Sequence, residues 1–565
     1  MRKENNNGKV FSVLIAIGLV VFGIIYMGIS LTKNLGKSKD VISKEKTLEV
    51  LNDLYDDITV NKVEARKAHV ELETTDLKDA LPDISKYPAQ VENTTNIFIE
   101  IFSSPEKAGE DKDSWLIKVA EDFNKAGVTV NGKAASVRIR SMASGMAMDY
   151  IVSGKYQPDA YTPSNELWGE MMKAQGSKVT LVEKRLVGNV SGVLMSKKKY
   201  DELMEKYGSI NLKNITEAVA ENKIAMGYTN PFASSTGLNF LISTLSTFDI
   251  KDPLSDKAVE GFEKFQTNIP FVAYTTMQMR ESAKSGVLDG FIMEYQTYIN
   301  AADLKSQYVF TPFGYRHDSP LYGIGDLSDD KKEILNKFVE FCKNEKYQKL
   351  AKEYGFNELD NYKSEVAEVS GDVISQAQRL WKEKKNLNQE IVAVFVADVS
   401  GSMAGEPLNK LKQSLISSSQ YIGKENSIGL VTFSSEVNVN LPIGKFDLNH
   451  RSLFTGAVTD MQAEGGTAMY DGIIVGTKML MEEKEKNPDA KFMLFVLSDG
   501  ETNVGHSLNH VEDIIKNLKI PVYTIGYNAN IKALSSISAI NEAASINADS
   551  DDVVYKLGSL FNAEM

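Results

Sequence analysis

A group of oxygen-bearing side chains follows an apolar stretch in the last third of the chain. Residues 391–397 form an unbroken run of β-branched and apolar residues, which is typical of a buried strand. Asp398, Ser400 and Ser402 come directly after it, at alternating positions. In an open α/β sheet, ligands bind at the carboxyl ends of the strands. Carboxylate and hydroxyl oxygens at that place predict a site for a hard divalent cation such as Mg²⁺.

Two later segments supply further oxygen ligands for the same cation. Thr467 precedes a predicted helix, and Asp499 follows a second buried strand. We expect Gly465 and Gly466 to let the Thr467 loop approach closely, and Gly500 to permit a tight turn after the aspartate. The two carboxylates and three hydroxyls partly neutralise Mg²⁺ or Mn²⁺ and leave room for a ligand from outside.

The elements that carry these residues alternate between strand and helix over residues 389–565. Apolar strands separated by amphipathic helices predict a doubly wound sheet with helices on both faces. The expected strands lie at 391–397, 428–433, 492–497 and 521–527, with an edge strand at 437–443 and helices at 408–422 and 468–481. In this fold, the segments that bear the oxygen ligands meet at one edge of the sheet.

This arrangement resembles the von Willebrand factor A domain over residues 389–565. The resemblance rests on Asp398, Ser400 and Ser402 in an Asp-x-Ser-x-Ser pattern, with the distant Thr467 and Asp499. These positions match the metal-ion-dependent adhesion site of that family. The resemblance implies a Rossmann-like fold, bound Mg²⁺ or Mn²⁺, and a protein partner that supplies an acidic side chain to the metal.

A second group of hydroxyl residues lies in the middle of the chain, where predicted strands end and helices begin. A helix N-terminus offers free N–H groups and the positive end of the helix dipole, so hydroxyls there predict an anion site. Helix capping is the competing explanation for Ser and Thr at such positions. The candidates are Ser103, Ser104, Ser144, Ser234, Ser235 and Thr236.

Residues 87–357 resemble the bacterial extracellular solute-binding proteins, which have the periplasmic-binding-protein fold. The resemblance is carried by strand ends and helix starts at 103–104, 158–161, 227–231, 234–237 and 290–294, and by closing helices at 338–348 and 354–356. It implies an α/β domain of two lobes that close over a small ligand, here a small anion. It also implies a location outside the cytoplasmic membrane.

The N-terminal segment predicts a membrane anchor. Residues 10–31 carry no charge and are long enough to span the membrane as a helix, after a short tail at 1–9. A cleaved signal peptide is the rival interpretation, since Arg2, Lys3 and Lys9 precede the run. The run is too long for a typical signal peptide, however, and no small-x-small cleavage site follows it. We therefore expect an uncleaved single anchor.

Two charged segments with helical periodicity connect these parts. The first, at 32–86, predicts a helical stalk with an apolar stripe formed by Leu48, Leu51, Tyr55 and Ile58. The second, at 358–388, predicts a helical linker with Ile374, Ala377 and Trp381 on one face.

Composition excludes several classes of function. The 565 residues require more than one domain, and the net charge of −13 argues against a nucleic-acid partner. The single cysteine, Cys342, allows no disulfide within the chain and is expected to be a core thiol. None of the five histidines lies in a catalytic motif, and no Gly-x-Ser-x-Gly elbow or P-loop is present. The protein is therefore not expected to be an enzyme.

These features together predict an adhesion or sensor protein of the bacterial cell envelope. It would cross the cell membrane once, with its N-terminus inside and its body extracytoplasmic. The charges flanking the anchor leave its orientation open, so the body is placed outside on the resemblance to solute-binding proteins. Two alternatives are a substrate receptor of a transport system and a cytoplasm-facing assembly factor that scaffolds an ATPase.

Overall fold

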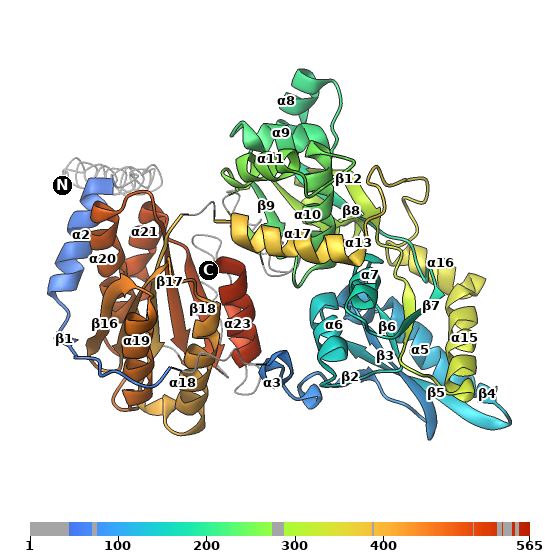
Figure 1. The fold of residues 1–565 in the computed structure, drawn as a ribbon, viewed down its shortest axis with the longest axis horizontal. Coiled ribbons are helices and arrows are strands. Elements are labelled where there is room, and N and C mark those ends of the chain that lie inside the picture. The colour runs from blue at the N-terminus through green and yellow to red at the C-terminus, as the bar shows by residue number, and fades with distance from the viewer. Residues whose placement is uncertain are drawn as a thin grey trace, which may run out of the picture.

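The computed structural model describes residues 44–70, 76–269, 271–273, 279, 288–386, 389–500, 502–527, 534, 545–548 and 553–565. The tail at 1–9 and the predicted anchor at 10–31 lie outside them. Within the described residues, no helix is long and apolar enough to cross a membrane. Figure 1 shows a C-terminal sheet domain beside a two-lobed domain built from the middle of the chain.

The C-terminal domain is built on one seven-stranded sheet in the order β1-β16-β15-β14-β17-β18-β19. β14, β15, β17, β18 and β19 run parallel, whereas β1 and β16 run the opposite way. The strands are β1 (Val60–Lys62), β14 (Ile391–Asp398), β15 (Ser427–Phe433), β16 (Val437–Lys445), β17 (Lys491–Ser498), β18 (Val522–Tyr527) and β19 (Ser545–Ala548).

Helices cover both faces of this sheet, as predicted. One face packs against α18 (Glu406–Ser418), α19 (Leu448–Asp460) and α23 (Val553–Glu564), and the other against α2 (Lys44–Asp56), α20 (Met469–Lys486) and α21 (Leu508–Leu518). Along β14, Phe395 faces the first group of helices and Val394 and Val396 face the second, and all three are fully buried. A strand buried on both faces needs no polar alternation, which explains the unbroken apolar run.

The expected helical stalk at 32–86 is wrong in part, because its described residues include a strand of the C-terminal domain. Helix α2 ends at Asp56, and β1 then pairs in parallel with β16. The prediction of β16 as an edge strand is also wrong, because β1 satisfies its outer backbone groups. The β-branched residues near 58–63 fit this strand. The strand is short and follows a helical apolar stripe directly, so the change from helical to strand periodicity is hard to recognise in the sequence.

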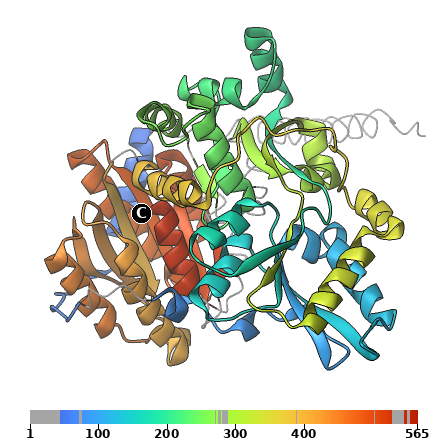
Figure 2. The same cartoon turned by 45° about the vertical axis from the view of Figure 1, so that its right-hand side comes forward.

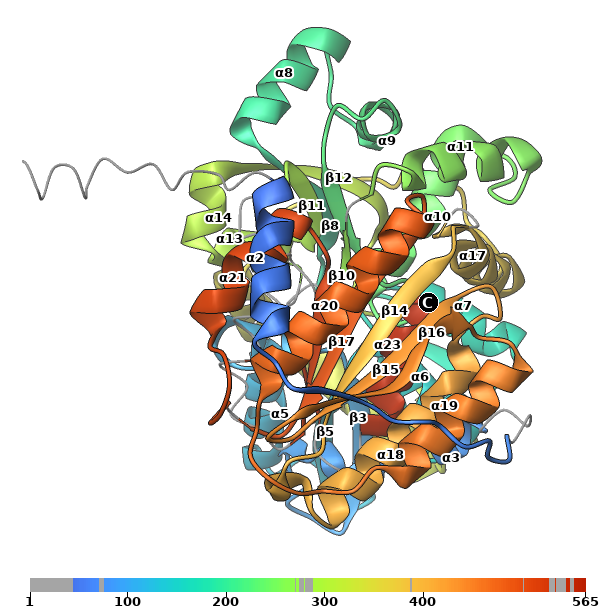
Figure 3. The ribbon, with the colours of Figure 1, turned by 90° about the vertical axis from the view of Figure 1, so that its left-hand side faces the viewer.

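The predicted apolar stripe of α2 packs into the core of the C-terminal domain. Leu51 is fully buried, and Leu48, Tyr55 and Ile58 contact the same hydrophobic cluster. Figure 3 shows α2 (blue) lying alongside α20 and α21. The segment is therefore structural rather than a free connector.

The two-lobed domain has one sheet in each lobe. The first lobe has the order β2-β5-β3-β6-β13-β7, with β4 paired to β5, and the second has the order β10-β9-β11-β8-β12. Among the described strands, the chain passes to the second lobe between β7 and β8 and returns between β12 and β13. The two crossings touch, because His317 N donates to Asn189 O at 3.0 Å.

The first lobe is formed by two separate stretches of the chain, and the second lobe by the stretch between them. The first lobe contains β2 (Ala89–Val91), β3 (Ile97–Ser103), β4 (Thr129–Val130), β5 (Lys133–Ser141), β6 (Ala160–Thr162), β7 (Val179–Glu183), β13 (Leu321–Ile324), α3 (Leu77–Ala80), α4 (Pro105–Ala108), α5 (Trp115–Lys125), α6 (Ser144–Ser153), α7 (Leu167–Ala174), α15 (Asp329–Lys343) and α16 (Glu345–Glu353). The second contains β8 (Val190–Ser196), β9 (Met226–Thr229), β10 (Phe271–Ala273), β11 (Gly290–Glu294), β12 (Tyr308–Arg316), α8 (Lys197–Tyr207), α9 (Leu212–Ala220), α10 (Ser235–Phe248), α11 (Asp256–Gln266), α13 (Tyr295–Asn300) and α14 (Ala302–Gln307). Short 3₁₀ turns are η1 (Ile84–Lys86), η2 (Asp111–Asp113), η3 (Gly401–Met403) and η4 (Ser419–Tyr421).

Helix α17 (Gly371–Lys384) packs against both lobes. Its predicted apolar face is confirmed, since Ile374, Ala377 and Trp381 are fully buried. The helix contacts α7 of the first lobe and α10 of the second, and Trp381 Nε1 donates to the Tyr228 hydroxyl at 2.7 Å. Among the described residues of the predicted linker at 358–388, only this part is helical, because residues 358–370 contain no helix.

We expect Leu51→Ala to lower the free energy of unfolding of the C-terminal domain by about 2–5 kcal/mol, because it opens a cavity in the core. Hydrogen exchange of β14 peptides in a urea series measures the change. The control is Val63→Ala, since Val63 is 45% exposed, and it should stay within about 0.5 kcal/mol of the wild type. Unchanged protection in Leu51→Ala would show that α2 does not belong to this core.

Candidate functional site

The predicted metal ligands lie on segments that meet at the carboxyl edge of the C-terminal sheet. Asp398 ends β14, and Asp499 directly follows β17, the hydrogen-bonded neighbour of β14. Ser402 joins these segments, because its Oγ donates to Asp499 Oδ1 at 2.9 Å and lies 3.0 Å from Ser400 Oγ. The structure thus brings these four residues together.

Thr467 reaches the same edge on the loop before α20. Gly401 N donates to Gly465 O at 3.1 Å, which holds this loop against the one that follows β14. Gly465 has a φ of 74°, and a Cβ there would lie 2.8 Å from Ser435 Oγ, so the predicted need for glycine is confirmed. The prediction for Gly500 is wrong, because its φ is not positive and a Cβ would meet nothing within 4 Å.

The carboxyl group of Asp398 is fully buried beside a second carboxylate. Burial raises its pKa, hydrogen bonds from Ser400 and Ser498 lower it, and the charge of Asp499 raises it. Ser498 Oγ donates to Asp398 Oδ2 at 2.5 Å, and Ser400 N donates to Oδ1 at 2.8 Å. No basic side chain of the described residues is among the main influences on this pKa. The repulsion between the two carboxylates is therefore suited to relief by a bound cation.

The donor set at this edge fits a hard cation. It consists of carboxylate and hydroxyl oxygens, the ligands that Mg²⁺ prefers. Among the described residues, no group of three or more His, Cys, Asp and Glu side chains is placed to hold a metal. A metal at this edge would therefore depend on the hydroxyls as well as on the two carboxylates. Ser402 is exposed and Asp499 is partly exposed, so a ligand from solvent has access on their side.

The six hydroxyl residues predicted for an anion lie near the seam between the two lobes. Five of them are at most 5% exposed, namely Ser103, Ser104, Ser144, Ser235 and Thr236. Ser103 Oγ donates to Ser104 O at 3.2 Å within the first lobe. Ser234 caps α10, because its Oγ accepts a hydrogen bond from Gly237 N at 3.3 Å. For Ser234, the structure thus shows the capping role that was the competing explanation.

Groups of opposite lobes are bonded directly to one another across this seam. Ser235 Oγ of α10 donates to Ser144 Oγ of α6 at 3.0 Å, and Trp168 Nε1 of α7 donates to Ser235 Oγ at 2.8 Å. The backbones also meet, because Gly145 N donates to Ala233 O at 3.3 Å. A solute that entered the seam here would have to separate these bonds.

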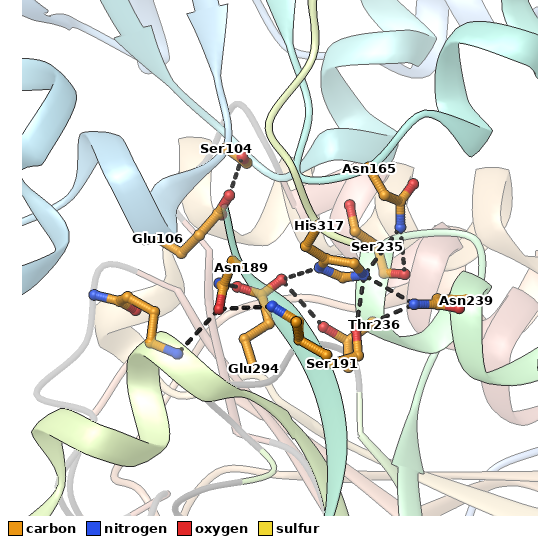
Figure 4. Close-up of polar contacts among 12 residues, drawn as sticks. Ser104, Glu106, Asn165, Asn189, Ser191, Ser235, Thr236, Asn239, Glu294 and His317 are labelled. Carbon is orange, nitrogen blue, oxygen red and sulfur yellow. Dashed lines mark hydrogen bonds and ion pairs between the residues drawn. The ribbon is translucent and has the colours of Figure 1, made fainter. Parts of the chain in front are cut away.

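A buried acid–imidazole pair lies in the same seam, and the sequence did not single it out (Figure 4). Glu294 Oε1 lies 2.7 Å from His317 Nδ1 and accepts a hydrogen bond from Thr236 Oγ1 at 3.3 Å. On the other side of the ring, His317 Nε2 lies 2.7 Å from Ser191 Oγ and 3.1 Å from Asn165 Nδ2. The imidazole therefore links Asn165 of the first lobe to residues of the second.

A buried lysine adds positive charge to the first-lobe side. Lys107 is fully buried, its Nζ lies 3.1 Å from Glu106 Oε1, and it donates to Ser104 Oγ. Burial lowers the pKa of this ammonium group, whereas the charges of Glu106 and Glu294 raise it. The sequence signal for these residues was weak. Glu294 ends the strand at 290–294 that carries the family resemblance, but Lys107 and His317 lie in no motif.

Two family models match separate parts of the chain. Residues 393–562 match the von Willebrand factor type A domain, and residues 108–357 match the bacterial extracellular solute-binding protein. The chain therefore combines an A domain with a solute-binding-like domain. Both resemblances predicted from the sequence are confirmed at this level.

Individual relatives match one domain or the other. Inter-alpha-trypsin inhibitor heavy chain H3 of Pongo abelii is 30% identical over 172 residues, which cover 28% of this chain and 19% of the relative. This chain thus spans about a fifth of that protein. A von Willebrand factor type A structure from Catenulispora acidiphila has a TM-score of 0.28 at 19% identity and covers 31% of this chain and 42% of its own. A periplasmic thiamin binding protein has a TM-score of 0.38 at 10% identity, over 52% of this chain and 98% of its own.

We expect Glu294→Ala to lower the free energy of unfolding of the solute-binding-like domain by about 1–3 kcal/mol, because it leaves His317 and Asn189 without their buried acceptor. Tryptophan fluorescence in a urea titration reports on this domain, because all three tryptophans of the chain pack within it.

The control for this change is Glu205→Ala on α8, where the glutamate is exposed. This control should unfold at the same urea concentration as the wild type. A midpoint of Glu294→Ala equal to that of the control would mean that the acid–imidazole pair does not stabilise the seam.

Proposed function

We propose that this protein is a membrane-anchored, extracytoplasmic adhesion or sensor protein that binds a protein partner through a divalent cation on its A domain. The ligands would be Asp398, Ser400, Ser402, Thr467 and Asp499. The hydrogen bond from Ser402 to Asp499 carries this proposal, because it joins the ends of β14 and β17 into one cluster of oxygens. Both domain types are binding domains, and nothing in the proposed role requires catalysis.

The residues around the proposed metal site have two different roles. Ser498 Oγ and Ser400 N fix the buried Asp398 carboxylate from below, so that its orientation is set before a cation arrives. Ser402 and Asp499 stand at the solvent side. Mg²⁺ or Mn²⁺ at this place would supply positive charge for an acidic side chain of the partner.

The solute-binding-like domain offers a second binding function at its seam. The hydroxyl groups and the Lys107 ammonium suit an anion, whereas the carboxylates of Glu106 and Glu294 repel one. The hydroxyls alone would favour a small anion. Because the carboxylates lie beside them, we propose that the small ligand of this seam carries both an anionic and a cationic group. The hydrogen bonds between the lobes must break before a ligand can enter the seam. We therefore propose that the main function is partner binding by the A domain, and not the capture of a transported solute.

Membrane attachment rests on the apolar run at 10–31. Helix α2 begins soon after that run and packs on the A domain. In this arrangement the A domain would stand nearest to the membrane, with the solute-binding-like domain attached to it.

Titration calorimetry of MgCl₂ and MnCl₂ tests the metal site on the full chain. We expect binding by the wild type and a loss of at least about tenfold in Asp499→Ala, because half of the carboxylate charge is removed. The matched control is Asp489→Ala, an exposed aspartate of the same domain, which should bind as the wild type does. Equal binding by Asp499→Ala and the wild type would refute the site.

Protease treatment of intact cells tests the proposed location. If the body is extracytoplasmic, an added protease degrades both domains while a cytoplasmic marker protein stays intact. Protection of both domains until the cells are lysed would reverse the orientation and favour the cytoplasm-facing assembly factor.

A further inference from the structure

A cavity of about 200 Å³ lies where the A domain meets the solute-binding-like domain. Its walls come from both sides, with Asp149 and Trp168 from the solute-binding-like domain and Ser418, Tyr421 and Tyr555 from the A domain. Figure 2 shows the C-terminal helix α23 (red) facing the helices of the two-lobed domain at this junction. The cavity adjoins the seam between the lobes, because Trp168 and Ala233 line it and also make contacts across that seam. None of the predicted metal ligands lines it.

The polar wall of this cavity carries a carboxyl group without a cationic partner in the described residues. The Tyr555 hydroxyl donates to Asp149 Oδ2 at 2.8 Å across the two domains. Burial raises the pKa of Asp149 to about 7, and the hydrogen bond from Tyr555 acts in the opposite direction. No basic side chain of the described residues contributes to this pKa. The carboxylate form would therefore gain from a positive charge placed in the cavity.

A second polar group lines the same space and has no hydrogen-bond partner among the described residues. Ser418 is 1% exposed, and its Oγ makes no hydrogen bond to the part of the chain that the structure describes. A buried hydroxyl left unpaired costs free energy, so such a group usually indicates a ligand or a water molecule. Its position among the lining residues gives a hydrogen-bond site opposite the solute-binding-like domain.

Four aromatic side chains form part of the remaining walls. Trp168, Phe232, Tyr421 and Tyr555 line the cavity beside the carboxyl group. Aromatic faces attract organic cations, and sets of such rings recognise ammonium groups. A bare metal ion fits this chemistry poorly, because Ca²⁺ and Mg²⁺ need about six or more oxygen ligands. The volume is also several times that of one water molecule.

We propose that this interdomain cavity binds a small organic ammonium compound, with Asp149 as its counter-ion and Ser418 as a hydrogen-bond partner. Because the walls belong to two domains, the bound cation stabilises their docked arrangement. The chain would thus have a small-molecule site that contacts the A domain directly, beside the seam between the lobes.

Calorimetric titration of choline chloride and tetramethylammonium chloride into the full chain at about pH 8 tests the proposal. We expect both cations to bind the wild type, and dimethylbutanol, the uncharged carbon isostere of choline, to bind at least about tenfold more weakly. Potassium chloride should give no binding. Failure of both ammonium salts to bind, or equal binding of the isostere, would overturn the proposal.

Variants locate the binding within the molecule. Asp149→Asn keeps the shape of the side chain and should weaken choline binding at least about tenfold. Ser418→Ala should weaken choline but leave tetramethylammonium unchanged, because only choline carries a hydroxyl. Asp201→Asn, an exposed aspartate on α8, is the matched control and should bind as the wild type does. Undiminished binding by Asp149→Asn would place the cation elsewhere and refute the site.

The pH dependence gives an independent readout. An ammonium ligand needs the carboxylate, so affinity for the wild type should fall roughly 50-fold from about pH 7 to about pH 5, whereas Asp149→Asn should show no such fall. The titratable groups around Asp149 are the hydroxyls of Tyr161, Tyr421 and Tyr555, the ammonium of Lys382 over the Tyr421 ring, and the exposed Lys78 and Asp79 of α3. An identical fall in Asp149→Asn would assign the dependence to one of these groups and contradict the role of Asp149.

Discussion

The parallel pairing of β14 with β17 is the constraint on which the proposed metal site depends. This pairing ends two buried strands at the same edge and forces Asp398 and Asp499 close together, although like charges repel. The packed core beneath supplies the stability that keeps them there. The apolar side chains of β14 are fully buried between the two layers of helices. The sheet thus holds a local electrostatic strain that a cation is suited to relieve.

The solute-binding-like domain shows a different balance of forces. Its polar groups do not stand open at the seam, but satisfy one another across it, as in the contacts of Ser235 with Ser144 and Trp168. Helix α17 adds a second connection, because it packs on α7 and α10 together. Contacts within the protein therefore hold the two lobes together without a ligand. A ligand in the seam would have to replace these contacts.

Local patterns in the sequence predicted the A-domain core and the segments that carry its oxygen ligands. The unbroken apolar run before Asp398 and the glycine at 465 can be interpreted from the local sequence alone. Cys342 is also buried as expected, and burial raises the pKa of its thiol. By contrast, the pairing of His317 with Glu294 and the docking of Asp149 against Tyr555 join residues distant in sequence. No periodicity or motif encodes such contacts, because they arise when whole lobes and domains come together.

Strand β1 makes the solute-binding-like domain an insertion within the A-domain fold. Asn61 Nδ2 donates to Glu436 Oε2 at 2.9 Å, although 375 positions separate the two residues. During synthesis, α2 and β1 leave the ribosome long before the strands that they join, while the inserted domain can fold in between. Closing so long a loop costs little more entropy once that domain is compact. The sheet of the A domain is thus completed last, and a chain that stops short of it leaves the apolar face of α2 uncovered.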